Sequence, residues 1–333
     1  MEKKINWGIL GCAGIAERAL IPAINESANG ILCGIAARDE KRAEDWARKH
    51  GFKKSYRDYQ SLIDDPAIDA IYNPLPNHLH SEWSVRAARA SKHVLCEKPM
   101  AMNAREVREM AAAAEASGTL LMEAFMYKFH PQMEKTAGLI SAGEIGRIRS
   151  VHSSFTFMCE LDGHNYRWFP EMGGGALYDV GCYTVSVSRL VFGDEPVSAF
   201  ARAVIHPERG VDVSTHILLE FPGGRFAHCD CAFDAHFQSR LLAVGERGTL
   251  GLDRAFSAKR HEVEVRVVHG DDITLIHVPS ANMYTRMVEH FGDCILGKET
   301  PRSFARDAEM NMRVIDACFE SIRTGLPAAV GGQ

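Results

Sequence analysis

The stretch at residues 92–99 reads Lys-His-Val-Leu-Cys-Glu-Lys-Pro. Its apolar middle predicts a short buried strand, and Pro99 ends that strand because proline cannot donate a hydrogen bond to a sheet ladder. Glu97 and Lys98 would then stand at the carboxyl end of the strand, where open parallel sheets collect their ligands. A surface turn with solvated charges is the alternative explanation, and the neighbouring segments decide between the two.

The first third of the chain alternates strand and helix patterns. Apolar runs predict strands at 5–10, 31–37, 69–72, 94–96 and 120–124, with helical patterns between them at 11–25, 40–49, 78–90 and 103–116. Strands that alternate with helices of about 10–15 residues indicate βαβ units and a parallel sheet. We therefore predict an α/β fold that begins with a doubly wound parallel sheet of the Rossmann type over residues 1–124.

Residues 125–333 favour longer strands joined by turns. The patterns predict strands at 149–157, 197–205, 213–221, 225–232, 241–244, 262–268 and 273–278, and closing helices at 283–296 and 305–324. Antiparallel pairing is expected, because the links are too short for crossover helices. We predict an α+β domain over 125–333 with a large, mostly antiparallel open sheet, helices on one face and a partner subunit on the other. The last helix could pack back on the first domain.

The turn after the first predicted strand is the candidate phosphate cradle. Residues 8–16 read Gly-Ile-Leu-Gly-Cys-Ala-Gly-Ile-Ala, so a glycine and two alanines take the three places of the dinucleotide fingerprint GxGxxG. Small side chains let the backbone approach a pyrophosphate, and the following helix offers free N–H groups to its charge. Glycines after a strand also form ordinary turns. The predicted contacts to a dinucleotide are Gly11, Cys12, Ala13, Gly14 and Ile15.

The end of the second predicted strand discriminates between NAD and NADP. An acidic residue there would accept hydrogen bonds from the ribose hydroxyls and favour NAD. The strand instead ends in Ala37 and Arg38. Arg38 can pair with a 2′-phosphate and stack on the adenine, which favours NADP over NAD without excluding the use of both. A solvated arginine at the start of a helix is the alternative.

The loop after the strand at 69–72 contains two prolines and two asparagines, which makes it rigid. Pro74 and Leu75 are predicted either to form a wall of the nicotinamide site or to serve plain loop packing. Asn77 is a candidate contact whose alternative role is to cap the following helix.

Residues 167–183 read Arg-Trp-Phe-Pro-Glu-Met-Gly-Gly-Gly-Ala-Leu-Tyr-Asp-Val-Gly-Cys-Tyr. The three glycines followed by a helical pattern predict a second helix start close to a ligand. Asp179 and Tyr183 are four residues apart and would project from one face of that helix, where a carboxylate beside a phenol can form an acid–base site. The alternative is a structural hydrogen bond for Asp179 and a core position for Tyr183. Tyr178 lies off that face and is predicted to pack.

Composition narrows the class of protein. The chain has 333 residues, 46% of them hydrophobic and 24% charged, with a formal net charge of −5, which gives no reason to expect nucleic acid or a membrane as partner. The nine cysteines show no metal-ligand spacing, the fifteen histidines form no pattern with carboxylates or thiols, and no metal site is expected. Because a strand pattern starts at residue 5, we expect no signal peptide, a cytoplasmic location and reduced thiols.

These motifs together resemble those of the Gfo/Idh/MocA oxidoreductases, named after glucose–fructose oxidoreductase and inositol dehydrogenase. The resemblance covers nearly the whole chain and is carried by the glycine turn and by residues 77–80, 93–99, 123–132 and 173–183. Many members have histidine where this chain has Tyr183. Tyrosine there is similar to the branch that contains dimeric dihydrodiol dehydrogenase, D-xylose dehydrogenases and glucose–fructose oxidoreductase, although this chain is expected to lack the export leader of the last.

The resemblance implies roles for individual residues. Tyr183 would exchange the hydroxyl proton of the substrate. A free tyrosine titrates near ~10, and the ammonium of Lys98 would lower that value and stabilise a developing alkoxide. Asp179 would orient the substrate or Lys98. The cofactor contacts that the resemblance adds are Asn77, His80, Glu97, Lys98 and Arg167, and it offers His164 and Asn165 as substrate contacts.

The resemblance also implies the reaction. The expected activity is an NADP-preferring dehydrogenase that oxidises an aldopyranose such as D-xylose or D-glucose to a lactone, or a cyclic diol, and catalyses the reverse reduction. The alternatives are a sugar–sugar oxidoreductase whose NADP never leaves and a non-catalytic NAD(P)-binding regulator. The open sheet suggests a homodimer or homotetramer.

Overall fold

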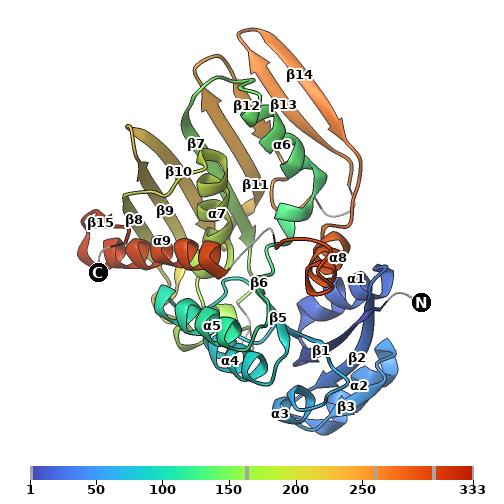
Figure 1. Cartoon of the computed structure of the whole chain (residues 1–333). Helices are drawn as coiled ribbons and strands as arrows, with labels where there is room; N and C mark the ends of the chain where they lie inside the picture. The colour runs from blue at the N-terminus through green and yellow to red at the C-terminus, as the bar shows by residue number, and fades with distance from the viewer. Residues whose placement is uncertain (1–2, 162–164, 259–260, 302–304, 332–333) are drawn as a thin grey trace. The chain divides into compact units, whose positions relative to one another are not determined.

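The computed structural model describes all residues except 1–2, 162–164, 259–260, 302–304 and 332–333 (Figure 1). Contacts divide the chain into two compact units. The first unit is Met1–Met126 with Asn282–Glu309, and the second is Tyr127–Ala281 with Met310–Gln333. The division into functional domains at residue 124 stays a prediction.

The first unit is built on a six-stranded sheet in the order β3-β2-β1-β4-β5-β6, in which every pair of neighbours is parallel. The predicted doubly wound parallel sheet is therefore confirmed. The strand order reverses between β1 and β4, so their carboxyl ends flank the switch point where such sheets bind ligands. The strands are β1 Ile5–Leu10, β2 Gly30–Ala36, β3 Lys54–Tyr56, β4 Ala70–Asn73, β5 His93–Cys96 and β6 Leu121–Glu123.

Helices follow the strands of this unit much as the sequence predicted. They are η1 Ala16–Leu20 continued by α1 Ile21–Glu26, α2 Glu40–His50, α3 Tyr59–Ile63, η2 Asn77–Leu79 continued by α4 His80–Arg89, and α5 Ala104–Ala116. Side-chain caps from Asp39, Asp58 and Asn103 explain where α2, α3 and α5 begin.

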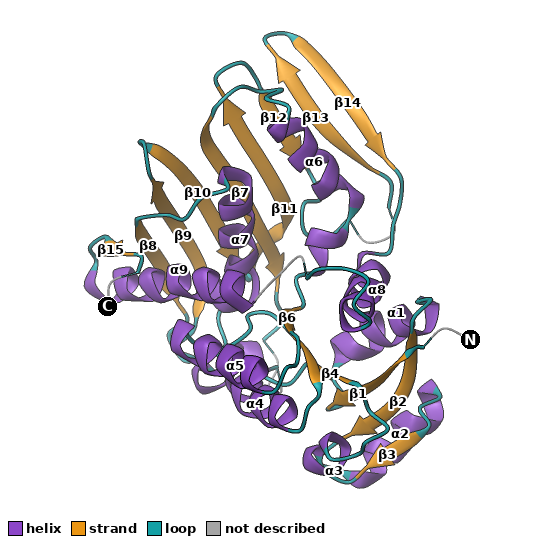
Figure 2. Ribbon diagram, in the orientation of Figure 1, coloured by secondary structure: helices purple, strands orange, loops and turns teal. Residues whose placement is uncertain are grey.

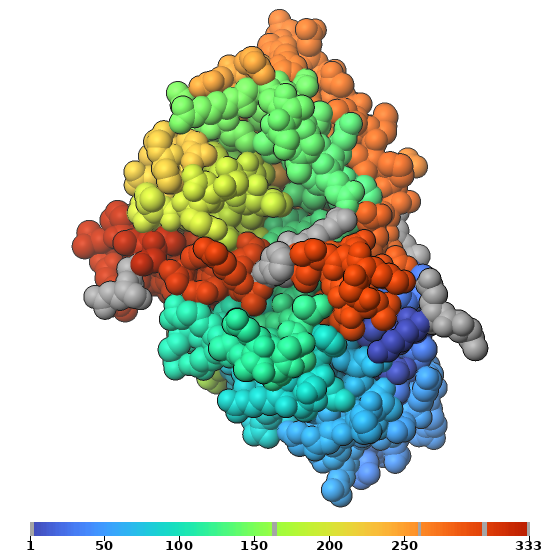
Figure 3. Space-filling view, in the orientation of Figure 1, coloured from blue at the N-terminus to red at the C-terminus, as the bar shows by residue number. Residues whose placement is uncertain are grey.

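Helix α8 (Met283–Ile295) packs on α1 and β2 of the first unit, and Figure 3 shows it against the dark blue N-terminal segment. Phe291 of α8 meets Trp7 of β1 with ring centroids 5.7 Å apart. The last helix, α9 (Ala305–Thr324), belongs to this unit only up to Glu309, which pairs with Arg108 of α5 at 3.4 Å. Helix α8 therefore packs on the first unit, and the packing of the last helix on the first domain stays a prediction.

The second unit is built on a nine-stranded sheet in the order β14-β13-β12-β11-β7-β10-β9-β8-β15. Only the pair β7–β10 is parallel among the described strands, so the predicted mostly antiparallel sheet is confirmed. The strands are β7 Ile148–Met158, β8 Ser198–Ile205, β9 Asp212–Phe221, β10 Arg225–Ala232, β11 Asp234–Gly245, β12 Thr249–Leu252, β13 Val263–His269, β14 Asp272–Val278 and β15 Ala328–Ala329.

Helices cover one face of this sheet (Figure 2). Helix α7 (Cys182–Phe192) packs on β7 and β10, and α6 (Pro131–Ser141) packs on β13. Burial alternates along β9, so the side chains of the other face stay exposed. The remaining short helices are η3 Met126–Phe129, η4 Tyr166–Trp168, η5 Pro170–Met172 and η6 Leu177–Gly181. Within the described residues, none of the helices has the length and apolarity needed to cross a membrane.

Candidate functional site

The glycine turn after β1 has the backbone that a dinucleotide requires. Gly11 has φ +82°, and a Cβ there would lie 3.0 Å from Leu75 Cδ2, so only glycine fits without displacing its neighbour. Its amide donates to Ala36 O at 2.7 Å, which ties the turn to the end of β2. Gly14 at the start of the following helix is exposed. These features fit a pyrophosphate lying against the turn and the helix start.

Two arginines flank this turn. Arg38 is exposed directly after β2, and Arg42 of α2 donates to Cys12 O at 3.1 Å. Asp39 between them caps α2 by accepting from Arg42 N at 3.1 Å, so its carboxylate serves the helix. Burial raises the pKa of Tyr59, and the charges of Arg38 and Arg42 oppose that shift. Arg42 was not predicted from the sequence, because its contact with Cys12 O joins two distant segments.

The loop after β4 is tied to the Glu97-Lys98-Pro99 turn through His80. The ring of His80 is fully buried, with Nε2 2.7 Å from Leu75 O and Nδ1 2.9 Å from Pro99 O. Burial lowers the pKa of His80 to about 4. Leu75 is thereby fixed beside Gly11. The alternative role of Asn77 as a helix cap is wrong, because Pro76 holds the cap position and Asn77 is already the first residue of η2.

A hydrogen bond from Tyr72 fixes the carboxylate of Glu97. Tyr72 of β4 donates to Glu97 Oε1 at 2.5 Å, and Glu97 is 9% exposed. Burial, followed by the charge of Glu97, raises the pKa of Tyr72, so the phenol stays a donor. Burial raises the pKa of Tyr284 of α8, the charge of Glu97 adds to this shift, and the charge of Lys98 opposes it. Neither tyrosine was predicted from the sequence. Lys98 itself is half-buried at the end of β5.

In the second unit, Asp212 of β9 fixes the helix start that follows the three glycines. Its Oδ2 accepts from Leu177 N and from Thr215 Oγ1, both at 2.7 Å. Gly175 has φ +108°, and a Cβ there would lie 2.0 Å from Asp212 Oδ1. The third glycine is therefore required by the carboxylate that caps the helix carrying Asp179 and Tyr183. Burial raises the pKa of Asp212 to about 6 against these donors.

Asp179 forms a two-pronged ion pair with Arg167. Arg167 Nε lies 2.6 Å from Asp179 Oδ2 and its second terminal nitrogen 3.1 Å from Oδ1. Asp179 is 3% exposed, so the arginine compensates for most of the cost of burying its charge. The structure thus brings together two predicted site residues that the sequence did not pair. The predicted contact of Arg167 with the cofactor stays a prediction.

Tyr183 lies in a cluster of aromatic rings of the second unit. Its ring centroid is 5.2 Å from that of Phe155, 5.5 Å from Phe256 and 5.8 Å from Tyr127. These contacts fix the plane of the phenol. Tyr178 was predicted to pack because it lies off the helix face of Asp179 and Tyr183. Its ring centroid lies 4.8 Å from that of Phe319, which confirms this packing.

The predicted substrate contacts Asn165 and His164 stay predictions. Asn165 Oδ1 accepts from Arg167 N at 3.2 Å and so begins η4. His164 lies outside the described residues. No group of three or more histidine, cysteine or acidic side chains suited to a metal occurs among the residues that the structure describes.

A parallel sheet with a glycine turn at its switch point defines the first unit as a dinucleotide-binding domain. Residues 5–125 match the family described as an oxidoreductase family with an NAD-binding Rossmann fold, and residues 133–251 match the GFO/IDH/MocA C-terminal domain. The chain belongs to the GFO/IDH/MocA oxidoreductase family, as the sequence motifs predicted, and is an NAD(P)-dependent oxidoreductase.

The chain is similar over nearly its full length to three proteins of known activity. The chain is 36% identical to D-xylose 1-dehydrogenase (NADP(+)) 2 of Haloferax volcanii, over 96% of this chain and 98% of the relative. It is 30% identical to a 3-ketoreductase from Actinomadura kijaniata in complex with NADP and TDP-benzene, with a TM-score of 0.91 over 96% and 98% of the two chains. It is 27% identical to an aldose–aldose oxidoreductase from Caulobacter crescentus complexed with glycerol, with a TM-score of 0.91 over 98% and 100%.

Proposed function

We propose that this protein is an NADP-preferring dehydrogenase that acts on a sugar hydroxyl, with an aldopyranose such as D-xylose or D-glucose oxidised to its lactone. The observation that carries the proposal is the full-length similarity to an NADP-dependent D-xylose dehydrogenase. Arg38 and Arg42 beside the glycine turn support the choice of NADP, because two guanidinium groups suit a 2′-phosphate. A cyclic diol is the second substrate class.

NADP, when bound, supplies the carbon that accepts or donates hydride. The residues proposed to hold it are Gly11, Cys12, Ala13, Gly14, Ile15, Ala37, Arg38, Pro74, Leu75, Asn77, His80, Glu97, Lys98 and Arg167. Lys98 and Tyr183 are proposed to act on the same substrate hydroxyl, with Tyr183 taking its proton and Lys98 stabilising the oxyanion. Asp179 orients the substrate.

Incubating the purified protein with NADP⁺ and a panel of aldoses, polyols and cyclic diols tests this proposal through the absorbance of reduced nicotinamide. Turnover is expected with at least one aldopyranose, and the product should react as a lactone. In a sugar–sugar oxidoreductase the cofactor would stay with the protein through gel filtration, as the similarity to the aldose–aldose enzyme allows. Binding of NADP(H) without turnover of any substrate would instead support a regulator.

Replacing Arg38 with alanine is expected to weaken the binding of NADP⁺ but not that of NAD⁺. One charge-assisted hydrogen bond contributes about 1.5–3 kcal/mol, so the KM for NADP⁺ should rise about 10–100-fold. Steady-state kinetics with both cofactors measure the shift. Arg48→Ala is the matched control, because Arg48 lies on α2 and pairs with Asp45 of the same helix. An unchanged NADP⁺/NAD⁺ preference in Arg38→Ala would refute the phosphate assignment.

The nine cysteines are free thiols, which supports a reducing compartment such as the cytoplasm as the proposed location.

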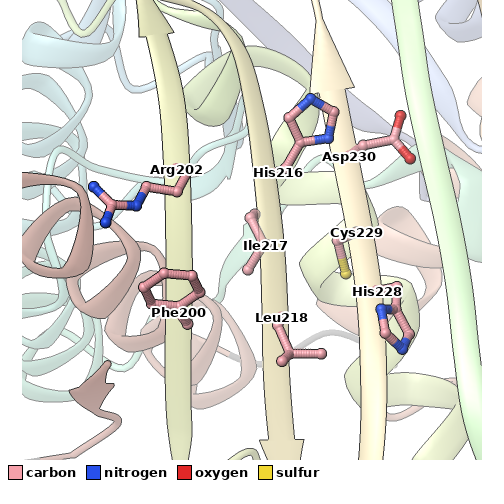
Figure 4. Close-up of a pocket in the computed structure, with 8 residues that line it drawn as sticks. All are labelled: Phe200, Arg202, His216, Ile217, Leu218, His228, Cys229 and Asp230. Carbon is pink, nitrogen blue, oxygen red and sulfur yellow. The ribbon is translucent and has the colours of Figure 1, made fainter. Parts of the chain in front are cut away.

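The open face of the nine-stranded sheet is proposed to bind a second copy of the chain. It holds a shallow pocket of about 300 Å³ between side chains of β8, β9 and β10 (Figure 4). Leu218 and Phe226 are each 36% exposed and Leu242 is 39% exposed on the same face, and His152 stacks on His228 at 4.8 Å. A face of this kind, pairing with itself about a two-fold axis, would bury these side chains.

Replacing Leu218 with glutamate is expected to convert a homodimer or homotetramer to a smaller species, because a charge would be buried in the interface without a partner. Sedimentation velocity of the wild type and the variant measures the change. Leu190→Glu on the helix-covered side of the unit is the control, since Leu190 is 46% exposed on α7. A monomeric wild type would refute the proposed interface.

A further inference from the structure

Helix α8 and the turn after it hold a cysteine, a histidine and a glutamate in hydrogen-bond order. Cys294 Sγ lies 3.5 Å from His290 Nε2, and His290 Nδ1 lies 2.6 Å from Glu299 Oε2. His290 and Cys294 are four residues apart, so both project from one face of the helix. The chain turns back after α8 through Gly297 at φ +72°, which brings Glu299 to the imidazole.

We infer that Cys294 is a reactive thiol, activated by His290 and Glu299, which small electrophiles and peroxides modify. The arrangement is a nucleophile within reach of a base that a third group orients. It lies wholly in the first unit and includes none of the residues proposed to bind cofactor or substrate. The inference therefore stands independently of the proposed function.

The hydrogen bonds orient the imidazole toward the thiol. His290 Nδ1 donates to Glu299 Oε2, which leaves Nε2 to accept the proton of Cys294 Sγ. Transfer of that proton gives a thiolate–imidazolium pair, in which the imidazolium stabilises the thiolate. The C-terminal end of α8 acts against an anion on Cys294, so the thiolate depends on His290. The side chain of His290 is 4% exposed, which keeps this pair from being screened by water.

The small exposed area decides which reagents can react. Cys294 is 7% exposed, so a peroxide or a small alkylating agent can reach the sulfur more easily than a bulky disulfide. With hydrogen peroxide, the thiolate attacks one oxygen, an S–O bond forms and the O–O bond breaks. The hydroxide that leaves takes the proton of His290 and becomes water. Cys294 is oxidised by two electrons to a sulfenic acid, and the peroxide is reduced.

Cys12 offers a reference within the same unit. It is half-exposed, but burial of its thiol, opposed by Arg42, raises its pKa to about 11. Greater exposure would make Cys12 the faster thiol, and its raised pKa would make it the slower one. The loss of rate at Cys294 in a His290 variant therefore has to accompany the order of the two rates as evidence for activation by the base.

Iodoacetamide at about pH 7, followed over time and resolved by peptide mass spectrometry, tests the inference on the full-length protein. Cys294 is expected to react about tenfold or more faster than Cys12. His290→Gln should reduce the rate at Cys294 about tenfold or more and leave the rate at Cys12 unchanged. Glu299→Gln, at a side chain 46% exposed, should slow Cys294 partly without disturbing the fold.

Hydrogen peroxide in limiting amounts, with dimedone as the trap for sulfenic acid, gives the second readout. Cys294 should be the first of the two cysteines to be trapped, and His290→Gln should abolish its priority. A rate at Cys294 no higher than at Cys12 would overturn the inference. So would a rate that both His290→Gln and Glu299→Gln leave unchanged, because Cys294 would then be an ordinary buried thiol.

Discussion

Replacing Tyr183 with phenylalanine is expected to lower kcat about 10²–10⁴-fold, the range that general acid–base groups contribute. The change removes only the hydroxyl that is proposed to take the proton of the substrate. Phenylalanine keeps the ring contacts with Phe155, Phe256 and Tyr127, so the fold should be preserved. Steady-state kinetics measure kcat, and a thermal melt together with an NADPH fluorescence titration shows whether folding and cofactor binding are intact.

Tyr178→Phe is the matched control, because Tyr178 lies five residues earlier and packs on Phe319. Its kcat is expected to stay within about twofold of the wild type, since a change of this kind away from the chemistry has a small effect. A Tyr183→Phe variant with full activity across the pH range would show that another group takes the proton.

The sheets were predictable because their strands carry continuous or alternating apolar runs. The hairpin between β9 and β10 followed from the Pro-Gly-Gly sequence at 222–224. Several short or weakly patterned elements were missed, among them β3, β12 and α6. β3 is a three-residue edge strand with mostly exposed side chains, β12 has only four residues, and α6 contains a glycine and a threonine that weaken its helical pattern.

The sequence predicts candidate site residues only where a local motif marks them. The glycine turn and the residues around Lys98 and Tyr183 are contiguous stretches with recognisable spacing. The contacts that orient them join distant residues, as in the hydrogen bond from Tyr72 to Glu97 and the cap that Asp212 gives to Leu177. No periodicity encodes such pairs, because they depend on which strands become neighbours. Asp212 explains why residue 175 is a glycine, since a Cβ there would meet the carboxylate. The sequence alone indicated only that a helix starts nearby.

Replacing Lys98 with alanine is expected to lower kcat/KM about 10²–10³-fold, the loss that follows removal of one group stabilising an oxyanion. Lys98 follows β5 directly, and its neighbours are fixed by Tyr72 on Glu97 and by His80 on Pro99. The ammonium is therefore held by a rigid backbone, and alanine leaves that backbone in place. Lys98→Arg should recover part of the loss because it keeps the charge, and Lys53→Ala, at an exposed lysine of the same unit, should have no effect.

The double variant Lys98→Ala/Tyr183→Phe tests whether the two side chains act on one substrate. If Lys98 lowers the pKa of the phenol and stabilises the same oxygen that Tyr183 deprotonates, either single substitution already removes most of their shared contribution to the rate. The second substitution then lowers the rate little further. The double variant should then lose far less than the product of the two single losses, as groups that act as a unit do. A strictly multiplicative loss would mean that each residue acts without the other. The shared site would then be refuted even if both residues were essential.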